Sequence, residues 1–215
     1  MKKKILFLAH DYWHALDIVK PMIPLLENDE LEIQLTDHPQ VFFDYTPDLL
    51  ISCKDPIEND QIPTPVWWDE TFSDLFLHRV REGMGAILFH AAVTDLPEDH
   101  PILKEAIRGT FVSHPKRCPV TLEPISVHPV LNGVTSFTLP DNDEQYIMNM
   151  NTDTQIIAET ISEHGRQPGI WAHTLDHGRI CCLTPGHTVN NLTCEPFIQI
   201  MKNAIEWCLD HERND

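Results

Sequence analysis

The chain has 215 residues, of which 42% are apolar, so it is long enough to bury the core of one ordinary α/β domain. Its formal net charge of −18 argues against nucleic acid and against an anionic membrane surface as partners, because both need a basic face. No apolar stretch is long enough for a signal-peptide core or a bilayer span, which predicts a soluble, cytoplasmic protein with reduced cysteines.

The first half of the chain alternates short apolar runs with helical segments. The runs predict buried strands at Lys4–Leu8, Glu30–Leu35, Leu49–Cys53 and Ala86–Phe89. Between them we expect a helix from about His14 to Leu26, kinked at its prolines, and another that ends near Arg81 with Thr71 or Ser73 as its N-cap. Loops are expected over 38–47 and 57–69. This alternation is typical of βαβ units and predicts a parallel sheet.

The second half has shorter elements and more turns. A short helix is expected over 101–107, and strands over 120–127, 137–139, 146–150 and 155–161. Two strands, 169–174 and 179–184, are joined by Asp176-His177-Gly178 as a hairpin, and 196–209 is an amphipathic helix. With no break in composition, we predict a single domain over 1–215. Its fold class is three-layer α/β, with a mainly parallel sheet, helices on both faces and an antiparallel extension toward the C-terminus.

Three histidines directly follow apolar strands. They are His10 after the first strand, His90 within the stretch EGMGAILFHAAVTD, and His187 after the last strand. Ligands bind at the carboxyl ends of strands in open α/β sheets, so parallel neighbours would gather these imidazoles at one rim. A histidine that merely satisfies a strand end is the alternative interpretation of each.

A carboxylate from the turn Asp143-Glu144 would complete such a cluster. Two imidazoles and a carboxylate suit either general acid–base catalysis or a divalent transition metal such as zinc. We therefore name His90, Glu144 and His187 as catalytic candidates, and the same three as candidate metal ligands. No HExxH-type spacing supports the metal, so both interpretations stay open.

Several short motifs occur together in a fixed order. They are Tyr12-Trp13-His14, EGMGAILFHAA, Gly109-Thr110-Phe111 with His114, His128-Pro129-Val130, Asp143-Glu144-x-Tyr146, Pro168-x-x-Trp171, Gly178-Arg179, Pro185-Gly186-His187 and Ala204-Ile205-x-Trp207. In this order, over nearly the whole chain, the set resembles the trehalose-utilisation (ThuA-like) family, whose fold resembles flavodoxin-like class I glutamine amidotransferases. The segment Pro39–Asp69 matches no part of that pattern.

The resemblance implies a role in sugar metabolism, with an enzyme acting on trehalose-type disaccharides or keto-sugar derivatives as the first expectation. Amidotransferases of this fold carry a cysteine at the strand-end turn where this chain has His90, so no glutaminase activity is expected. His14, His114, Tyr146 and Trp171 are expected to line the sugar pocket. A non-catalytic sugar-binding or regulatory module, and a subunit active only within a complex, are the alternatives; whether copies form a homo-oligomer stays open.

Overall fold

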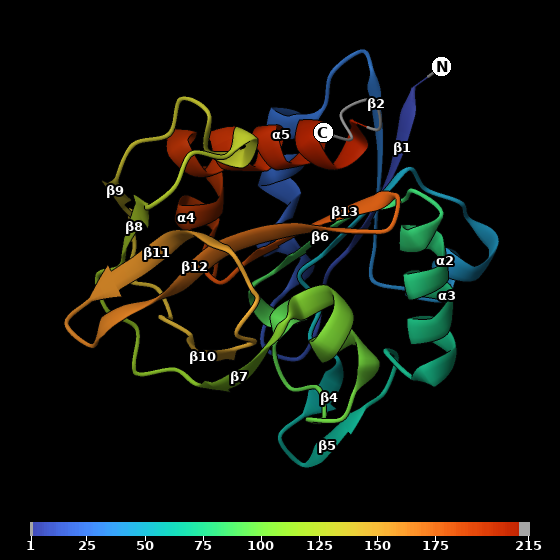
Figure 1. The fold of residues 1–215 in the computed structure, drawn as a ribbon, viewed down its shortest axis with the longest axis horizontal. Helices are drawn as coiled ribbons and strands as arrows, with labels where there is room; N and C mark the ends of the chain where they lie inside the picture. The colour runs from blue at the N-terminus through green and yellow to red at the C-terminus, as the bar shows by residue number, and fades with distance from the viewer. Residues whose placement is uncertain (1, 211–215) are drawn as a thin grey trace.

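A nine-stranded sheet organises the protein, whose computed structural model describes residues 2–210 (Figure 1). One half of the sheet consists of five parallel strands in the order β2-β1-β3-β6-β13. The last three, β3, β6 and β13, are buried along their whole length because their apolar runs face helices on both sides. Their bounds are β1 Lys3–Leu8, β2 Leu31–Thr36, β3 Leu49–Ser52, β6 Gly85–Phe89 and β13 Gly178–Leu183.

The other half of the sheet is antiparallel and continues from β13 in the order β12-β11-β8-β9. The predicted hairpin joins β12 to β13, and Asp176 takes a left-handed backbone (φ 51°) in its turn. The predicted mainly parallel α/β sheet with an antiparallel extension is therefore confirmed. The added strands are β8 Thr121–Pro124, β9 Phe137–Thr138, β11 Ile156–Ser162 and β12 Gly165–Leu175.

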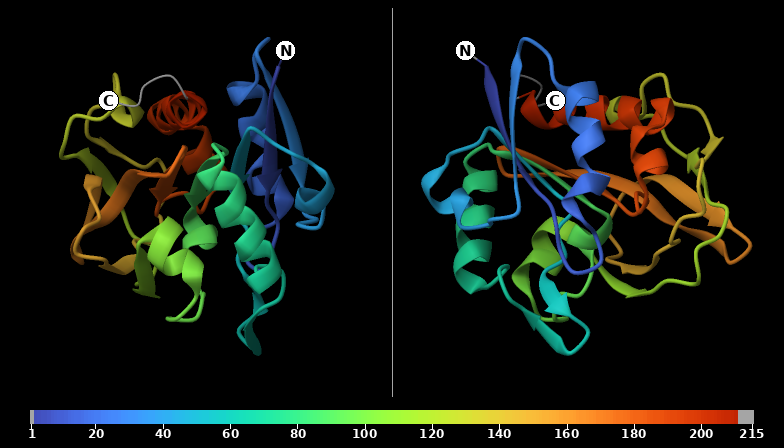
Figure 2. Two further views of the ribbon diagram at one scale, coloured as in Figure 1. Left: turned by 45° about the vertical axis from the view of Figure 1, so that its right-hand side comes forward. Right: turned by 180° about the vertical axis from the view of Figure 1, so that it is seen from behind.

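Helices cover both faces of the sheet, as the two turned views show (Figure 2). Alternate residues of β1 explain the layering: Phe7 packs in the cluster under α5, whereas Leu6 and Leu8 pack in the cluster that contains the apolar face of α3. On the α5 side lie α1 Ile23–Leu26, α4 Val189–Thr193, α5 Glu195–Leu209 and the 3₁₀ turns η2 Lys20–Met22 and η5 Pro129–Leu131. On the α3 side lie α2 Val41–Asp44, α3 Glu70–Arg81, the 3₁₀ turn η3 His90–Val93 and the π-helix η4 Leu103–Ile107.

Two small antiparallel ribbons lie outside the main sheet. One pairs β4 Ile57–Asn59 with β5 Ile62–Pro65, so the expected loop over 57–69 contains a hairpin. The other pairs β7 Gly109–Ser113, which the sequence did not predict, with β10 Ile147–Met150. This second ribbon places the segment before β10 beside the end of the parallel sheet.

Two helix predictions need correction. The expected helix over 14–26 is divided into η1 Leu16–Ile18, η2 and α1, because Pro21 and Pro24 cannot donate the backbone hydrogen bonds of a continuous helix. Helix α3 begins earlier than expected, and its N-cap is Asp69, whose side chain accepts the Phe72 amide at 2.8 Å. None of the helices in the described part of the chain is long and apolar enough to cross a membrane.

Candidate functional site

The carboxyl ends of β1, β3, β6 and β13 surround a cavity of about 390 Å³, which we call the carboxyl-edge cavity. Each strand ends in a loop that supplies polar side chains, and the segment before β10 adds more. Parallel strands bring their carboxyl ends to one edge, so residues far apart in the chain meet here. The lining includes Trp13, His14, Asp55, Glu144, Tyr146 and His187.

His90 occupies the sharp turn that follows β6. Its backbone is left-handed (φ 49°), a conformation that costs a non-glycine residue about 1–2 kcal/mol, and its side chain is buried. Its Nδ1 lies 3.1 Å from the Thr184 carbonyl, which only accepts, so Nδ1 carries the proton and Nε2 presents a lone pair to the site. Burial, with the neighbouring His14 and His187, holds the pKa of His90 well below its usual range and keeps the ring neutral.

His187 follows β13 on a loop that Asp143 holds in place. The buried Asp143 carboxylate accepts the amides of Gly186 (2.9 Å), His187 (3.1 Å) and Glu144 (3.0 Å). Gly186 has φ 135°, and a Cβ there would lie 2.9 Å from Leu192, so the turn requires glycine. One carboxylate thus positions both the imidazole of His187 and the neighbouring Glu144.

His14, rather than the predicted His10, supplies the third imidazole. His10 has a left-handed backbone (φ 78°) and an exposed side chain, and it does not line the cavity, so the prediction that it joins the rim cluster is wrong. The next residue, Asp11, accepts the His14 amide at 2.8 Å and His14 Nδ1 at 2.9 Å. This local turn directs His14 Nε2 toward the other two rings.

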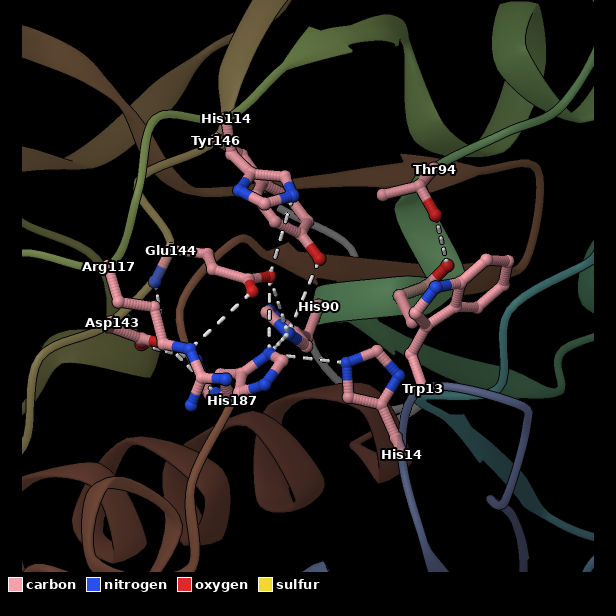
Figure 3. Close-up of polar contacts among 12 residues, drawn as sticks. Trp13, His14, His90, Thr94, His114, Arg117, Asp143, Glu144, Tyr146 and His187 are labelled. Atoms are coloured by element: carbon pink, nitrogen blue, oxygen red, sulfur yellow. Dashed lines mark hydrogen bonds and ion pairs between the residues drawn. The ribbon is translucent and has the colours of Figure 1, made fainter. Parts of the chain in front are cut away.

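The reactive atoms of these residues converge, as Figure 3 shows. His187 Nδ1 lies 3.0 Å from His90 Nε2, 3.3 Å from His14 Nε2 and 3.2 Å from Glu144 Oε2. Glu144 Oε2 is also 3.8 Å from His90 Nε2. The structure therefore brings together the three predicted catalytic candidates and His14.

Glu144 is the carboxylate of this cluster, and only 13% of its side chain is exposed. Burial opposes its ionisation, but the hydrogen bond with His187 and the electrostatic attraction of the surrounding imidazoles outweigh it and lower the pKa of Glu144 to about 2. His114, as predicted, lines the cavity, with Nε2 3.9 Å from Glu144 Oε2. Glu144 is therefore an anionic base at neutral pH.

Tyr146 forms a buried wall behind this carboxylate. Its ring stacks on His90 with centroids 4.8 Å apart, and its hydroxyl lies 3.3 Å from His90 Nε2. Burial, followed by the charge of Glu144, raises the pKa of Tyr146 well above its usual range, so the phenol stays protonated and donates to the His90 lone pair. Phe111 and the half-exposed Trp13 add apolar surface to the same cavity.

A second polar wall was missed by the sequence prediction. Asp55, Thr94 and Asp95 line the side of the cavity across from Glu144, and the Thr94 hydroxyl donates to Asp55 Oδ2 at 3.3 Å. Burial raises the pKa of Asp55 to about 7. Asp55 comes just after β3. The argument that polar residues at the carboxyl ends of parallel strands are site candidates, which selected His90, therefore also applied to Asp55.

Trp171 does not line the cavity, and the prediction that it does is wrong. Its side chain is fully buried on the α3 side of the sheet, and its indole N–H donates to the Ile107 carbonyl at 2.6 Å. In β12 it pairs with Cys182 of β13, within the sheet rather than at its edge. Trp171 is therefore a core residue.

The sequence profile of the ThuA family, described as trehalose utilisation, matches residues 3–208. The chain belongs to the ThuA family. Among curated proteins, none matches it in sequence.

Solved structures of ThuA-like proteins share this fold. A ThuA-like protein of Parabacteroides merdae is 16% identical, with a TM-score of 0.76, and the match covers 100% of this chain and 92% of that one. A second, from Bacteroides uniformis, is 18% identical with a TM-score of 0.73, covering 96% and 91%. The fold also occurs within the β-galactosidase of Rahnella sp. R3 (9% identity, TM-score 0.66), where it matches 100% of this chain but 32% of that one.

This ThuA-family chain has another cavity of similar size at the opposite ends of β3, β6 and β13. This amino-edge cavity of about 450 Å³ is lined by residues that precede those strands and by the end of α3. Arg79 lines this cavity, but its guanidinium already donates hydrogen bonds to the backbone carbonyls of Phe42 and Tyr45. Its other polar lining residues include Asp48, His78, Glu82 and His177.

Proposed function

We propose that this ThuA-family protein is an enzyme of sugar metabolism that acts on a trehalose-type disaccharide or a keto-sugar derivative in the carboxyl-edge cavity. The observation that carries the proposal is the approach of one anionic carboxylate and two imidazoles, those of His14 and His90, to within hydrogen-bond distance of His187 Nδ1. Family membership supplies the substrate class, because the family is described by trehalose utilisation.

The chemistry that best suits these groups is proton transfer on the sugar. Glu144, ionised at neutral pH, is the general base, and the neutral phenol of Tyr146 is a hydrogen-bond donor to a developing oxyanion. Isomerases and lyases of keto sugars both begin by removing a proton next to a carbonyl. His90 and His187, held by Thr184 and Asp143, orient the reacting oxygen.

The shape of the cavity supports a sugar. About 390 Å³ is at the lower end of small-molecule sites and accommodates one sugar ring, leaving a second ring at the open mouth beside the exposed Trp13. Apolar C–H faces of the sugar would pack on Trp13 and Phe111, while its hydroxyl groups reach Asp55, Thr94 and His114.

The direct test is turnover. Purified protein is incubated with trehalose and with its keto derivatives, and products are followed by NMR; the Glu144→Gln variant is the matched control. Product formation that depends on Glu144 supports the proposal. Saturable sugar binding without turnover would replace it with the sugar-binding module, and neither binding nor turnover of these sugars would overturn both.

The proposal also excludes glutaminase activity, since no cysteine lines the carboxyl-edge cavity within the described residues. Cys181 and Cys182 are fully buried in β13, and burial raises the pKa of both thiols well above the usual range. Ammonia release from glutamine that is lost on cysteine alkylation would contradict this expectation.

A further inference from the structure

The imidazoles of the carboxyl-edge cavity have their lone pairs directed at one point. His14 Nδ1 donates to the Asp11 carboxylate and His90 Nδ1 donates to the Thr184 carbonyl, neither of which can donate in return. In the tautomers that these contacts select, both Nε2 atoms carry a lone pair, and both face His187 Nδ1 at 3.3 and 3.0 Å.

Protons on these residues alone cannot satisfy that arrangement. His187 Nδ1 carries at most one hydrogen, yet His14 Nε2, His90 Nε2 and Glu144 Oε2 all approach it as acceptors. The Tyr146 hydroxyl can donate to His90 Nε2, which still leaves two acceptors for a single N–H. Buried acceptors that face one another without a donor are costly, and a cation between them removes that cost.

The distances match the edges of a small coordination polyhedron. Four ligands about 2.0–2.1 Å from a tetrahedral ion lie about 3.3 Å from one another. The observed separations around His187 Nδ1 are 3.0, 3.2 and 3.3 Å, and the three imidazole donor atoms all lie within 4.8 Å of one another.

The surroundings of two rings are those of metal ligands. Ligating histidines nearly always donate their second N–H to a carboxylate or a backbone carbonyl, which fixes the tautomer and orients the ring. Asp11 does this for His14 and Thr184 does it for His90. Asp11 is itself fixed, since it also accepts the amides of Trp13 at 2.9 Å and Asp55 at 2.9 Å.

From these observations we propose that His14, His90 and His187 bind one divalent transition-metal ion of borderline softness, such as Zn²⁺, with Glu144 Oε2 as the fourth ligand. This set adds His14 to the three residues that the sequence suggested. A catalytic role for this ion rests on the proposed function. The binding of the ion itself does not depend on that function.

The donor set selects the class of metal. Three imidazoles with one carboxylate suit zinc and its neighbours in the first transition row, whereas Mg²⁺ and Ca²⁺ prefer oxygen ligands alone and Cu(I) prefers thiolates. When bound, the ion would supply Lewis-acid polarisation of a sugar oxygen, and Glu144 would be the carboxylate placed beside it to accept a proton.

The test measures metal content rather than turnover. Full-length protein is stripped with a chelator, loaded with Zn²⁺ or Co²⁺, dialysed, and analysed by mass spectrometry for metal per chain. We expect one ion per chain, and with Co²⁺ the intense visible absorption of a four-coordinate site. Less than about a tenth of an ion per chain after Zn²⁺ loading, with no such Co²⁺ spectrum, overturns the proposal.

Matched variants locate the ion. His14→Ala should reduce affinity at least about 100-fold, and Asp11→Asn, which weakens the support of His14, about 10–100-fold. The double variant His78→Ala/His177→Ala removes two exposed imidazoles of the amino-edge cavity and should retain the ion. Cys118→Ser should also retain it, which distinguishes the site from the group Cys118, Glu163 and His164. Loss of metal in either control but not in His14→Ala contradicts the assignment.

Different results would overturn the proposed sugar enzyme and the proposed metal ion. Stoichiometric metal in a protein that turns over no trehalose or keto derivative supports the ion and removes the sugar enzyme. Turnover that persists undiminished in metal-free protein supports the enzyme and removes the ion's catalytic role.

Discussion

The two ends of β3, β6 and β13 carry cavities of similar volume but different organisation. At the amino edge, about 450 Å³ is lined by exposed side chains such as His78, Glu82 and His177, and Arg79 there already contacts the backbone. At the carboxyl edge, about 390 Å³ is lined by His14, Glu144 and His187, and the reactive atoms of His14 and Glu144 lie 3.3 and 3.2 Å from His187 Nδ1. The volume of a cavity therefore does not distinguish a candidate site in this protein, whereas the convergence of oriented polar atoms does.

The largest expected effect tests that difference with one glutamate at each edge. Glu144→Gln removes the anionic base and should reduce turnover about 10²–10⁴-fold. Glu82→Gln, an exposed change beside the amino-edge cavity, should leave kcat and KM unchanged. Equal losses in the two variants, measured as kcat/KM on whichever sugar is turned over, would remove the distinction between the cavities.

A second comparison uses one aspartate from each edge and measures stability. Asp143→Asn leaves a single acceptor oxygen for three backbone amides and turns an NH₂ group toward them, so it should cost about 1–3 kcal/mol. Asp48→Asn affects a side chain that is 36% exposed and should change the free energy of unfolding by less than about 0.5 kcal/mol. Urea unfolding measures both; a larger effect at Asp48 would contradict the assigned roles.

The third prediction concerns pH. The raised pKa of Asp55, about 7 against 3.8, means that the native protein holds a proton that the unfolded chain has released. Its contribution to stability is complete below pH 3.8 and is lost as the pH rises to about 7. Between pH 5 and 8, Asp55→Asn should therefore show a shallower decline in the free energy of unfolding than the wild type, by about 2 kcal/mol. Parallel pH profiles would show that Asp55 does not titrate in this range.

The smallest expected effect concerns the apolar aromatic surface of Trp13 and Phe111 in the carboxyl-edge cavity. The described lining residues of the amino-edge cavity include no tryptophan, tyrosine or phenylalanine. Trp13→Ala should raise the dissociation constant for the sugar about 3–10-fold, because one stacking surface is lost, whereas Trp13→Phe should keep most of the affinity. Calorimetric titration measures both variants. Unchanged affinity in Trp13→Ala would place the sugar away from this aromatic surface.

The carboxyl-edge cavity was partly predictable because parallel strands share an edge. His90 and His187 follow strands that their apolar runs identify, so their convergence follows from the topology. Choosing His14 over His10 was beyond this rule, since it depends on a left-handed residue and the Asp11 turn. The sequence indicated His14 through the family resemblance and through its position before the first expected helix.

The wrong prediction for Trp171 and the unpredicted ribbon of β7 and β10 have other causes. Trp171 lies in a strand that is covered on both faces, where alternation cannot reveal which side chain meets solvent, so its burial was not visible in the sequence. The ribbon of β7 and β10, which brings Glu144 and Tyr146 to the cavity, depends on pairing between segments that lie far apart in the chain. The main sheet followed from local patterns, but these long-range contacts did not.

The hydrogen bonds to Asp143 also affect the local opening motions of the cavity. Because one carboxylate accepts amides from both the Glu144 segment and the Gly186-His187 loop, the two segments cannot separate without breaking the hydrogen bonds of Gly186 and His187 to Asp143. Native-state hydrogen exchange should then record these amides as one cooperative unit, with a common opening free energy that is lower than that of the strands behind them. Substrate entry and product release would both require that opening. The lifetime of the hydrogen bonds to Asp143 would then limit the rates of substrate binding and product release.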